Sequence, residues 1–354
     1  MIHYIRGVKR AVSSAAQGRG LMTAAGKLLS IYRREGMGGI TRRLALYCRR
    51  SVTRKTNRPH VRRDFALCIP FNYPVERPAG IKAAAIIHIY YVDLASEILS
   101  YLQNVPGQLD VYISTVSPLA RDVVRTVFAV YTKGSVDIRV FENRGRDIAA
   151  KLVGFRDVYA SYDYILSLHT KKSPHGGHEL ARWRNYLYEN LLGSPEIVAS
   201  IFSIMHKQNV GMVFPQHFYF LQDILEWGES FDQFYEVAQR MGIQIDHKTV
   251  LECPSGSMFW CRGDALRPIL DLNLQVGDFQ KEAGQIDGTL AHAIERAFLF
   301  AVEKQGYRWA KVVKSDLYPL PSTVLPINDP SDLPDRLRRV YRPLLHSRSH
   351  ILQS

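Results

Sequence analysis

The chain has 354 residues, 46% of them hydrophobic and 22% charged, which is ordinary for a globular protein of one large domain or two small ones. Its four irregularly spaced cysteines form no CxxC pair, which excludes a zinc ribbon or a disulfide framework and favours a reducing, cytosolic setting. The net charge is +13. We find no secretory signal and no apolar run of the roughly 20 residues that span a bilayer, which argues against export and membrane insertion.

The positive charge lies mainly at the amino-terminal end of the chain. Residues 1–63 contain 16 Lys or Arg and one acidic residue, whereas the other 291 residues contain 30 basic and 32 acidic residues. Short apolar groups, interrupted by the GMGG sequence at 36–39, predict a basic helical arm that ends in a polar linker. Such an arm can lie on an anionic membrane surface, where each basic residue contributes about 1 kcal/mol.

Two alternatives to a membrane-binding arm stay open. Residues 1–63 can form a solvated, partly disordered segment, or they can bind nucleic acid. The remainder of the chain is nearly neutral, which argues against a phosphate-binding surface on the body of the protein. We therefore expect no nucleic-acid partner.

Strand-like and helix-like segments alternate after residue 80. Buried-strand patterns and amphipathic helical patterns follow one another with short connections, at 83–91, 93–105, 109–117, 119–132, 135–143, 146–161 and 162–170. This alternation predicts right-handed βαβ units. We therefore predict an α/β fold in which helices flank a mostly parallel central sheet.

In sheets of this kind, ligands bind beyond the carboxyl ends of the strands. The first predicted strand contains His88 and leads to Asp93, the third leads to 143–147, and the fourth leads to the HTKKS sequence at 169–173. These three polar segments meet at one edge of the predicted sheet. We therefore predict a single ligand site there, with His88 and Asp93 contacting a nucleotide donor.

A dense polar turn joins the third strand to the third helix. It contains Asn143, Arg144, Gly145, Arg146 and Asp147. Gly145 permits close approach of the backbone, and the helix amino terminus offers free N–H groups to an anion. We predict that the five residues bind the donor nucleotide, with a simple helix cap as the alternative for Asp147. The turn matches neither the GxGxxG dinucleotide fingerprint nor a phosphate-binding P-loop.

The LHTKKS sequence at 168–173 predicts a diphosphate-binding loop. Enzymes that transfer a sugar from a nucleoside diphosphate must neutralise the leaving diphosphate, and many hold a divalent metal with an Asp-x-Asp pair. This segment has no such pair, but Lys171 and Lys172 can supply positive charge and His169 can donate a hydrogen bond. We therefore predict no required metal, with a solvated basic loop as the alternative.

Small residues stand beside bulky aromatic ones in the PSGSMFWCR sequence at 254–262. Ser257, Phe259 and Trp260 suit the wall of a site for a sugar or another acceptor ring. The alternative is ordinary core packing. The spacing does not match a GxSxG nucleophile elbow.

A clear helical pattern, DGTLAHAIERAFLFAVEK, covers residues 287–304. An inverting transferase needs a carboxylate near the acceptor hydroxyl to act as a general base. We predict Asp287 in this role, with Glu295 as the second candidate and helix capping as the alternative for Asp287. The helix lacks an HExxH sequence and does not indicate a metal site.

Five sequences in this order resemble the rhamnan synthesis protein F family, whose members are glycosyltransferase-like proteins of bacterial cell-wall polysaccharide and O-antigen assembly. They are ENRGRDI, YDYILSLHTKKS, WRNYLYENLLGS, PSGSMFWCR and DGTLAHAIER. The resemblance covers about residues 80–315. It implies a GT-A-like nucleotide-diphospho-sugar transferase domain, which we place at 64–315, followed by a Pro-rich and then basic tail at 316–354.

The resemblance also implies a function. We expect an inverting rhamnosyltransferase that uses a nucleoside-diphosphate deoxysugar, with dTDP-L-rhamnose as the first choice, to extend a lipid-linked glycan. It would work at the inner face of the bacterial cytoplasmic membrane, held there by the arm and accompanied by other polysaccharide-assembly enzymes. The alternative is a catalytically inactive module of the same fold that binds glycan or scaffolds the assembly.

Overall fold

The computed structural model describes residues 61–172, 177–222, 225–228, 230–246, 249–282 and 287–345, together with Met37. The chain divides into two compact units, and the second, residues 57–354, contains the sheet. The predicted basic arm at 1–63 lies outside the described residues except for Met37 and the short 3-10 helix η1 (Val61–Arg63).

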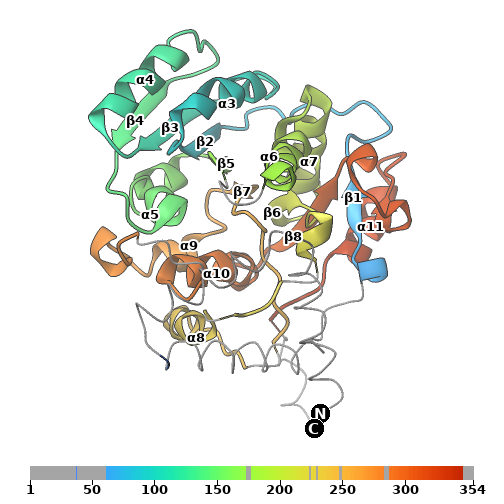
Figure 1. Ribbon diagram of the computed structural model, residues 1–354. Coiled ribbons are helices and arrows are strands. Elements are labelled where there is room, and N and C mark those ends of the chain that lie inside the picture. Colours follow the sequence, from blue (N-terminus) through green and yellow to red (C-terminus); the bar gives the residue numbers. More distant parts are fainter. Residues whose placement is uncertain are drawn as a thin grey trace, which may run out of the picture. The chain divides into compact units, whose positions relative to one another are not determined.

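Within the described residues, the strands form one nine-stranded sheet with the order β4-β3-β2-β5-β7-β6-β8-β1-β9 (Figure 1). Neighbouring strands are parallel except that β7 runs antiparallel to β5 and β6. The predicted α/β fold with a mostly parallel sheet is confirmed. The strands are β1 (Ala66–Cys68), β2 (Ala83–His88), β3 (Asp110–Thr115), β4 (Val136–Val140), β5 (Tyr164–His169), β6 (Val210–Pro215), β7 (Phe259–Arg262), β8 (Arg308–Val313) and β9 (Val324–Leu325).

Helices cover both faces of the sheet (Figure 1). One hydrophobic cluster joins the sheet to α3 (Ala95–Leu102), α4 (Pro118–Phe128), α6 (Gly177–Leu192), α7 (Pro195–Lys207) and α11 (Asp332–Val340). A second cluster joins it to α5 (Arg146–Leu152), α8 (Phe231–Arg240), α9 (Arg267–Leu270) and α10 (Leu290–Lys304). Successive strand residues point to opposite faces, so strands covered on both sides, such as β2 and β5, are buried along their whole length.

Serine caps begin two of the covering helices. Ser117 accepts a hydrogen bond from the backbone N–H of Ala120 at the start of α4, and Ser194 accepts one from Ile197 at the start of α7. Each cap is followed by proline at the first helical position, where the missing N–H costs nothing. Every helix in the described part of the chain is too short or too polar to cross a membrane.

The sheet continues into the segment that the sequence predicts as a separate tail. β9 pairs in parallel with β1, and α11 packs Leu333, Leu337 and Val340 into the core. These three residues recur at helical spacing and form a buried stripe. The packed domain therefore extends beyond residue 315, as far as residue 345 in the described chain.

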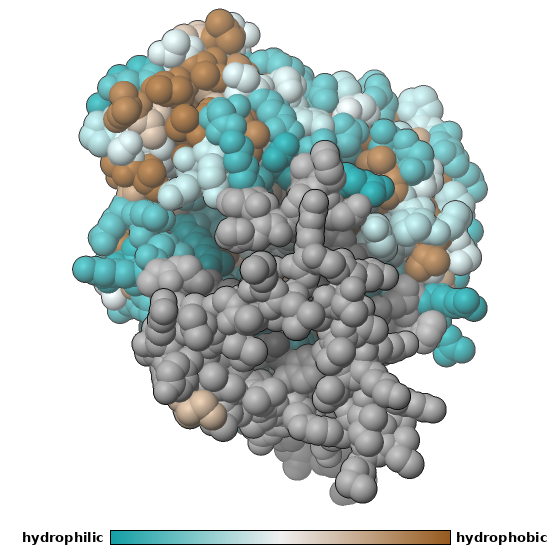
Figure 2. Space-filling view, viewed as in Figure 1, coloured by the Kyte–Doolittle hydropathy of each residue, from teal (hydrophilic) through white to brown (hydrophobic). Residues whose placement is uncertain are grey.

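The strand β4 lies at one edge of the sheet. Exposed apolar side chains gather on and beside β4 and α4, where Figure 2 shows a hydrophobic area; they are Leu119, Val123, Val130 and Val140. Edge strands and exposed apolar patches of this kind are common sites of contact with other molecules.

Candidate functional site

The topology places a switch point between β2 and β5. After β2 the chain adds β3 and β4 on one side, and it then crosses to add β5 on the other side. His88 and His169, the last residues of the two strands, are register partners. The backbone N–H of Thr170 donates to the carbonyl of His88 at 2.9 Å, and the Thr170 hydroxyl accepts from the N–H of Tyr90 at 2.9 Å. The loops after β2 and β5 are thus tied together where open α/β sheets bind ligands.

The two strand-end histidines are buried and neutral at neutral pH. Burial lowers the pKa of His88 to about 4, and its Nδ1 lies 2.9 Å from the Ser114 hydroxyl. Burial also lowers the pKa of His169 to about 3, and it outweighs the nearby Asp147, which raises that pKa. Neutral imidazoles can exchange hydrogen bonds with a ligand but add no positive charge.

Asp147 forms a buried ion pair with Lys151, one turn along α5. The Oδ2 to Nζ distance is 3.0 Å, and the exposed fractions of the side chains are 13% and 2%. Burial raises the pKa of Asp147, but His169 and Lys151 outweigh this effect and hold the pKa well below its usual range. Gly145 occupies the N-cap position of α5 and Asp147 lies within its first turn, so Asp147 is not the N-cap residue. Since His169 is neutral, Lys151 is the counter-ion at neutral pH.

The turn before α5 is fastened to the segment 277–281. Gly145 has a φ of +67°, and a Cβ placed there would lie 2.5 Å from the ring of Phe279. Arg144 pairs with Glu142 at 3.3 Å and donates to the carbonyl of Gly277 at 3.3 Å. The glycine is therefore required by the left-handed backbone and by this packing. The neighbouring Asn143 is exposed.

Arg146 reaches from α5 to the start of α10. It has a positive φ of 53°, its Nε donates to Glu282 at 3.2 Å, and its Nη1 lies 3.2 Å from Nε2 of His292. The other ring nitrogen of His292 lies 2.7 Å from the hydroxyl of Thr289, the residue that precedes α10. Arg146 thereby links the polar turn to α10, which contains Glu295 and begins just after Asp287.

The two carboxylates near α10 differ in their surroundings. Asp287 accepts a hydrogen bond from Ser230 at 2.5 Å and pairs with Arg296 at 3.1 Å, so a cation and a hydroxyl stabilise its charged form. Thr289, rather than Asp287, occupies the N-cap position of α10. Among the described residues, the side chain of Glu295 has no hydrogen bond or salt bridge, and it is close enough to Lys171 to raise that lysine's pKa.

The adjacent lysines after β5 have separate environments. The Nζ of Lys171 lies 3.8 Å from the ring centre of Trp183. Burial lowers the pKa of Lys171, while Glu295 and Asp147 raise it. Lys172 instead forms an exposed ion pair with Asp93, and this contact lowers the pKa of Asp93. Lys171 therefore belongs to the buried group around Asp147, and Lys172 is engaged at the surface.

The predicted acceptor residues lie in and next to the central strand β7. Ser257 is buried with a φ of +54°, and its carbonyl accepts from Lys151 at 2.9 Å. Phe259 and Trp260 are completely buried and pack in the two opposite hydrophobic clusters. Because β7 is covered on both faces, neither aromatic side chain lines an acceptor site in this structure, and core packing describes both.

A second buried polar cluster lies beside β6 and β8, and the sequence did not reveal it. Asp64, His217 and Glu252 bring potential metal ligands within 4.8 Å of one another. Lys311, 2% exposed, pairs with Asp64 and, at 3.2 Å, with Glu252. The lysine ammonium already supplies the positive charge that a metal ion would bring. These residues could hold a metal only if Lys311 were displaced.

Lys151, His292 and Trp183 also belong to the site, although the sequence analysis assigned them no role. The (i, i+4) spacing of Asp147 and Lys151 was a readable signal, since such pairs meet on one face of a helix. The contact between Lys171 and Trp183 joins distant segments and left no such signal.

Comparison with known proteins gives one family match. The model described as "Rhamnan synthesis protein F" matches residues 65–307. Two proteins from Xanthomonas campestris pathovar campestris, strains B100 and ATCC 33913, are each 35% identical over 230 residues; both carry the name "Uncharacterized protein WxcX". The alignment covers 64% of this chain and 32% of theirs, so the chain spans about a third of the length of these relatives.

Among solved structures, the apo form of mouse xyloside xylosyltransferase 1 aligns with 70% of this chain and 85% of its own. The sequence identity is 8% and the TM-score is 0.28.

Proposed function

Because this chain belongs to the rhamnan synthesis protein F family, we propose that it is a glycosyltransferase that acts in the synthesis of a bacterial polysaccharide. The family match at 65–307 contains the whole polar group at the ends of β2 and β5. One observation carries the proposal beyond the family name. The ends of β2 and β5 meet at the switch point of the sheet, where Asp147 and Glu295, distant in sequence, both act electrostatically on Lys171.

The proposed donor is a nucleoside-diphosphate deoxysugar, with dTDP-L-rhamnose as the first choice because a rhamnan is a polymer of rhamnose. We propose a GT-A-like site in which Lys171 faces the diphosphate as a point charge. The exposed pair of Lys172 and Asp93 lies beside it and is proposed to contact the nucleoside end. The polar turn at 143–147 is proposed to complete the donor site.

The proposed reaction inverts the anomeric centre in one displacement. The acceptor hydroxyl oxygen bonds to the anomeric carbon, its proton passes to a carboxylate, and the bond from that carbon to the diphosphate oxygen breaks. Glu295 is the proposed base, since Asp287 is already paired with Arg296 and bonded to Ser230. The negative charge that develops on the diphosphate is stabilised by Lys171.

Adjacent lysines provide a matched test of this assignment. Lys171→Gln should lower kcat/KM for sugar transfer by about a hundredfold or more, the size expected for removal of a transition-state charge contact. Lys172→Gln should cost clearly less, because that lysine is exposed and paired with Asp93. Equal losses in the two variants would contradict the proposed contact between Lys171 and the diphosphate.

The base is tested separately. Glu295→Gln should lower kcat while the dissociation constant of the donor stays within a few-fold of wild type, since a base acts in the transition state. Asp287→Asn should also lower the protein's stability, because it removes the partner of Arg296. A collapse of donor binding in Glu295→Gln would remove Glu295 from the role of base.

We also propose that the basic arm at 1–63 holds the enzyme at the inner face of the cytoplasmic membrane, next to a lipid-linked acceptor. Deletion of residues 1–60 should release the protein from vesicles containing anionic lipid, and 0.5 M salt should release the intact protein. Cosedimentation that is equal for both proteins would place the membrane contact elsewhere. The chain spans only about a third of the length of the curated relatives, so partners of the assembled system are a further proposal.

A further inference from the structure

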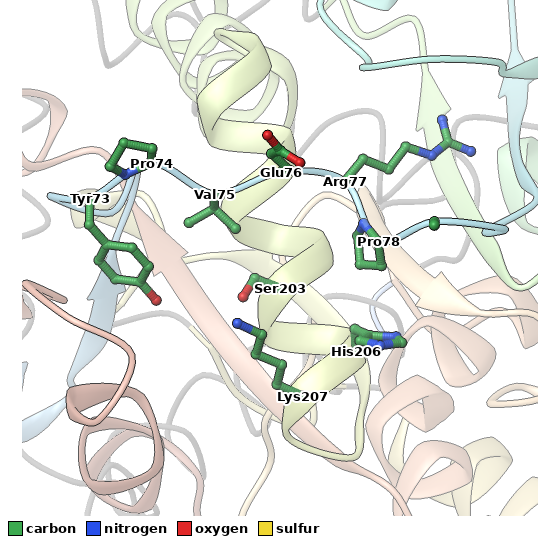
Figure 3. A pocket seen from close by; sticks show the side chains of 10 residues that line it. Tyr73, Pro74, Val75, Glu76, Arg77, Pro78, Ser203, His206 and Lys207 are labelled. Atoms are coloured by element: carbon green, nitrogen blue, oxygen red, sulfur yellow. The ribbon is translucent and has the colours of Figure 1, made fainter.

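The structure contains a pocket of about 400 Å³ that is lined by none of the residues of the proposed transfer site. It is formed by residues 73–79, which precede β2, and by the last turns of α7, which precede β6 (Figure 3). β2 and β6 run in the same direction in the sheet, so the last turn of α7 lies at the amino ends of the strands, and residues 73–79 lead from β1 toward that end. The proposed transfer site lies at their carboxyl ends. The volume falls in the range of about 300–1,000 Å³ that is typical of small-molecule sites.

Polar groups converge in this pocket without partners. Figure 3 shows the side chains of Tyr73, Ser203 and Lys207 directed toward one another below the segment 73–78. Among the described residues, neither the Tyr73 hydroxyl nor the Ser203 hydroxyl has a hydrogen-bond partner, although both oxygens are shielded from solvent. Ser203 itself is 1% exposed. Buried hydroxyls are normally bonded, so two orphans around one pocket indicate a missing partner.

Ser200, one turn earlier on the same helix, shows the usual arrangement. Its hydroxyl accepts from the backbone N–H of Phe71 at 3.1 Å and donates to the carbonyl of Glu196 at 2.7 Å. It is as buried as Ser203. The missing bonds at Ser203 are therefore not a general property of serines on this face of α7.

The charges around the pocket disfavour an anion. The pocket lies at the carboxyl end of α7, where the free carbonyls of a helix carry partial negative charge. Burial raises the pKa of Tyr73, and Asp329 and Asp332 add to that increase, so both carboxylates act on the pocket wall. Arg77 is committed to the carbonyls of Pro106, Gln108 and Ile81. The ammonium of Lys207 in turn disfavours a cation.

We propose that this pocket binds a neutral saccharide, as a second subsite that holds a glycan chain away from the transfer site. The ring of Tyr73 and the neighbouring prolines Pro74 and Pro78 provide apolar surface for the face of a sugar ring. The hydroxyls of Tyr73 and Ser203 and the ammonium of Lys207 provide donors and acceptors for sugar hydroxyls. The identity of the saccharide as the product or acceptor chain rests on the proposed function.

The test measures binding, without turnover, of a rhamnose hexasaccharide to the full-length protein by isothermal titration. The double variant Tyr73→Phe/Lys207→Met removes one orphan hydroxyl and one exposed ammonium and retains the apolar stems. We expect its affinity for the hexasaccharide to fall at least tenfold. Its melting temperature should stay within about 2 °C of that of wild type. Lys304→Met is the matched control, because Lys304 ends α10 as Lys207 ends α7, and both are exposed.

Three results would overturn the inference. They are no binding of the hexasaccharide to wild type, equal affinity in the double variant, and displacement of the saccharide by inorganic phosphate. Failure of the proposed function has a different signature: the hexasaccharide would still bind through the pocket, and no nucleotide sugar would be turned over.

Discussion

Removal of the Asp147 carboxylate is the perturbation whose effect is most directly worked out from the structure. The Nζ of Lys151 is buried and has two oxygen partners, Asp147 at 3.0 Å and the carbonyl of Ser257 at 2.9 Å. It also lies 5.4 Å from the ring centre of Phe259. Asp147→Asn removes the neutralising charge and leaves the buried ammonium with neutral acceptors only.

Breaking a buried ion pair in this way typically costs about 3–5 kcal/mol, because it leaves an uncompensated buried charge. Domains have only about 5–15 kcal/mol of stability in total, so the variant should be severely destabilised. The double variant Asp147→Asn/Lys151→Met removes both charges and should lose much less than the sum of the single variants. Asp157→Asn is the matched control, since Asp157 pairs with Arg139 at 2.9 Å but is 66% exposed; it should cost at most about 1 kcal/mol.

The assay is equilibrium unfolding in urea at pH 7, followed by tryptophan fluorescence. The reasoning would be refuted by an Asp147→Asn variant whose free energy of unfolding lies within about 1 kcal/mol of that of Asp157→Asn. It would also be refuted by a double variant that loses the full sum of the single losses, because the two side chains would then be independent.

Three further predictions concern the buried histidines, Gly145 and Ser200. Burial lowers the pKa of His88 and His169 in the folded protein, so between about pH 4 and 6.5 the unfolded chain binds more protons. The free energy of unfolding should therefore be highest above about pH 6.5 and fall by about 1.4 kcal/mol per pH unit for each histidine as the pH drops toward 4. Urea midpoints at pH 7 and pH 5 measure this loss, and equal midpoints would contradict it. Gly145→Ala should cost at least about 1–3 kcal/mol, since it adds a Cβ at a positive φ and against Phe279; an unchanged melting temperature would exclude that strain. Ser200→Ala should cost about 1–3 kcal/mol by leaving a buried backbone N–H without an acceptor, and a neutral result in thermal unfolding would show that water replaces the hydroxyl.

The sequence predicts the sheet and one edge of the site because both depend on local patterns. The buried runs that became β2 and β5 are short, apolar and bounded by polar segments, so their type could be read directly. The rule that ligands bind at the carboxyl ends of strands then placed His88 and His169 at the same edge. Lys171 followed from its position after β5.

The remaining features depend on contacts between distant segments. The aromatic pair Phe259 and Trp260 looks the same in sequence whether it lines a pocket or fills a core, and only the insertion of β7 between β5 and β6 buries both faces. Asp64 and Lys311 meet although 247 residues separate them. Similarly, the partners of Asp287 include Ser230, which no local pattern connects to it.

The most direct test of the central proposal is the initial rate of sugar transfer by the purified protein. The assay would supply a panel of nucleotide sugars that includes dTDP-L-rhamnose, a rhamnosylated lipid-linked acceptor, and EDTA in one arm. We expect transfer from one donor at a rate that EDTA leaves unchanged, because Lys171 is proposed to take the part of the metal. Transfer that is lost with EDTA and restored by a divalent cation would contradict this role of Lys171, and no transfer from any donor would contradict the proposed glycosyltransferase activity.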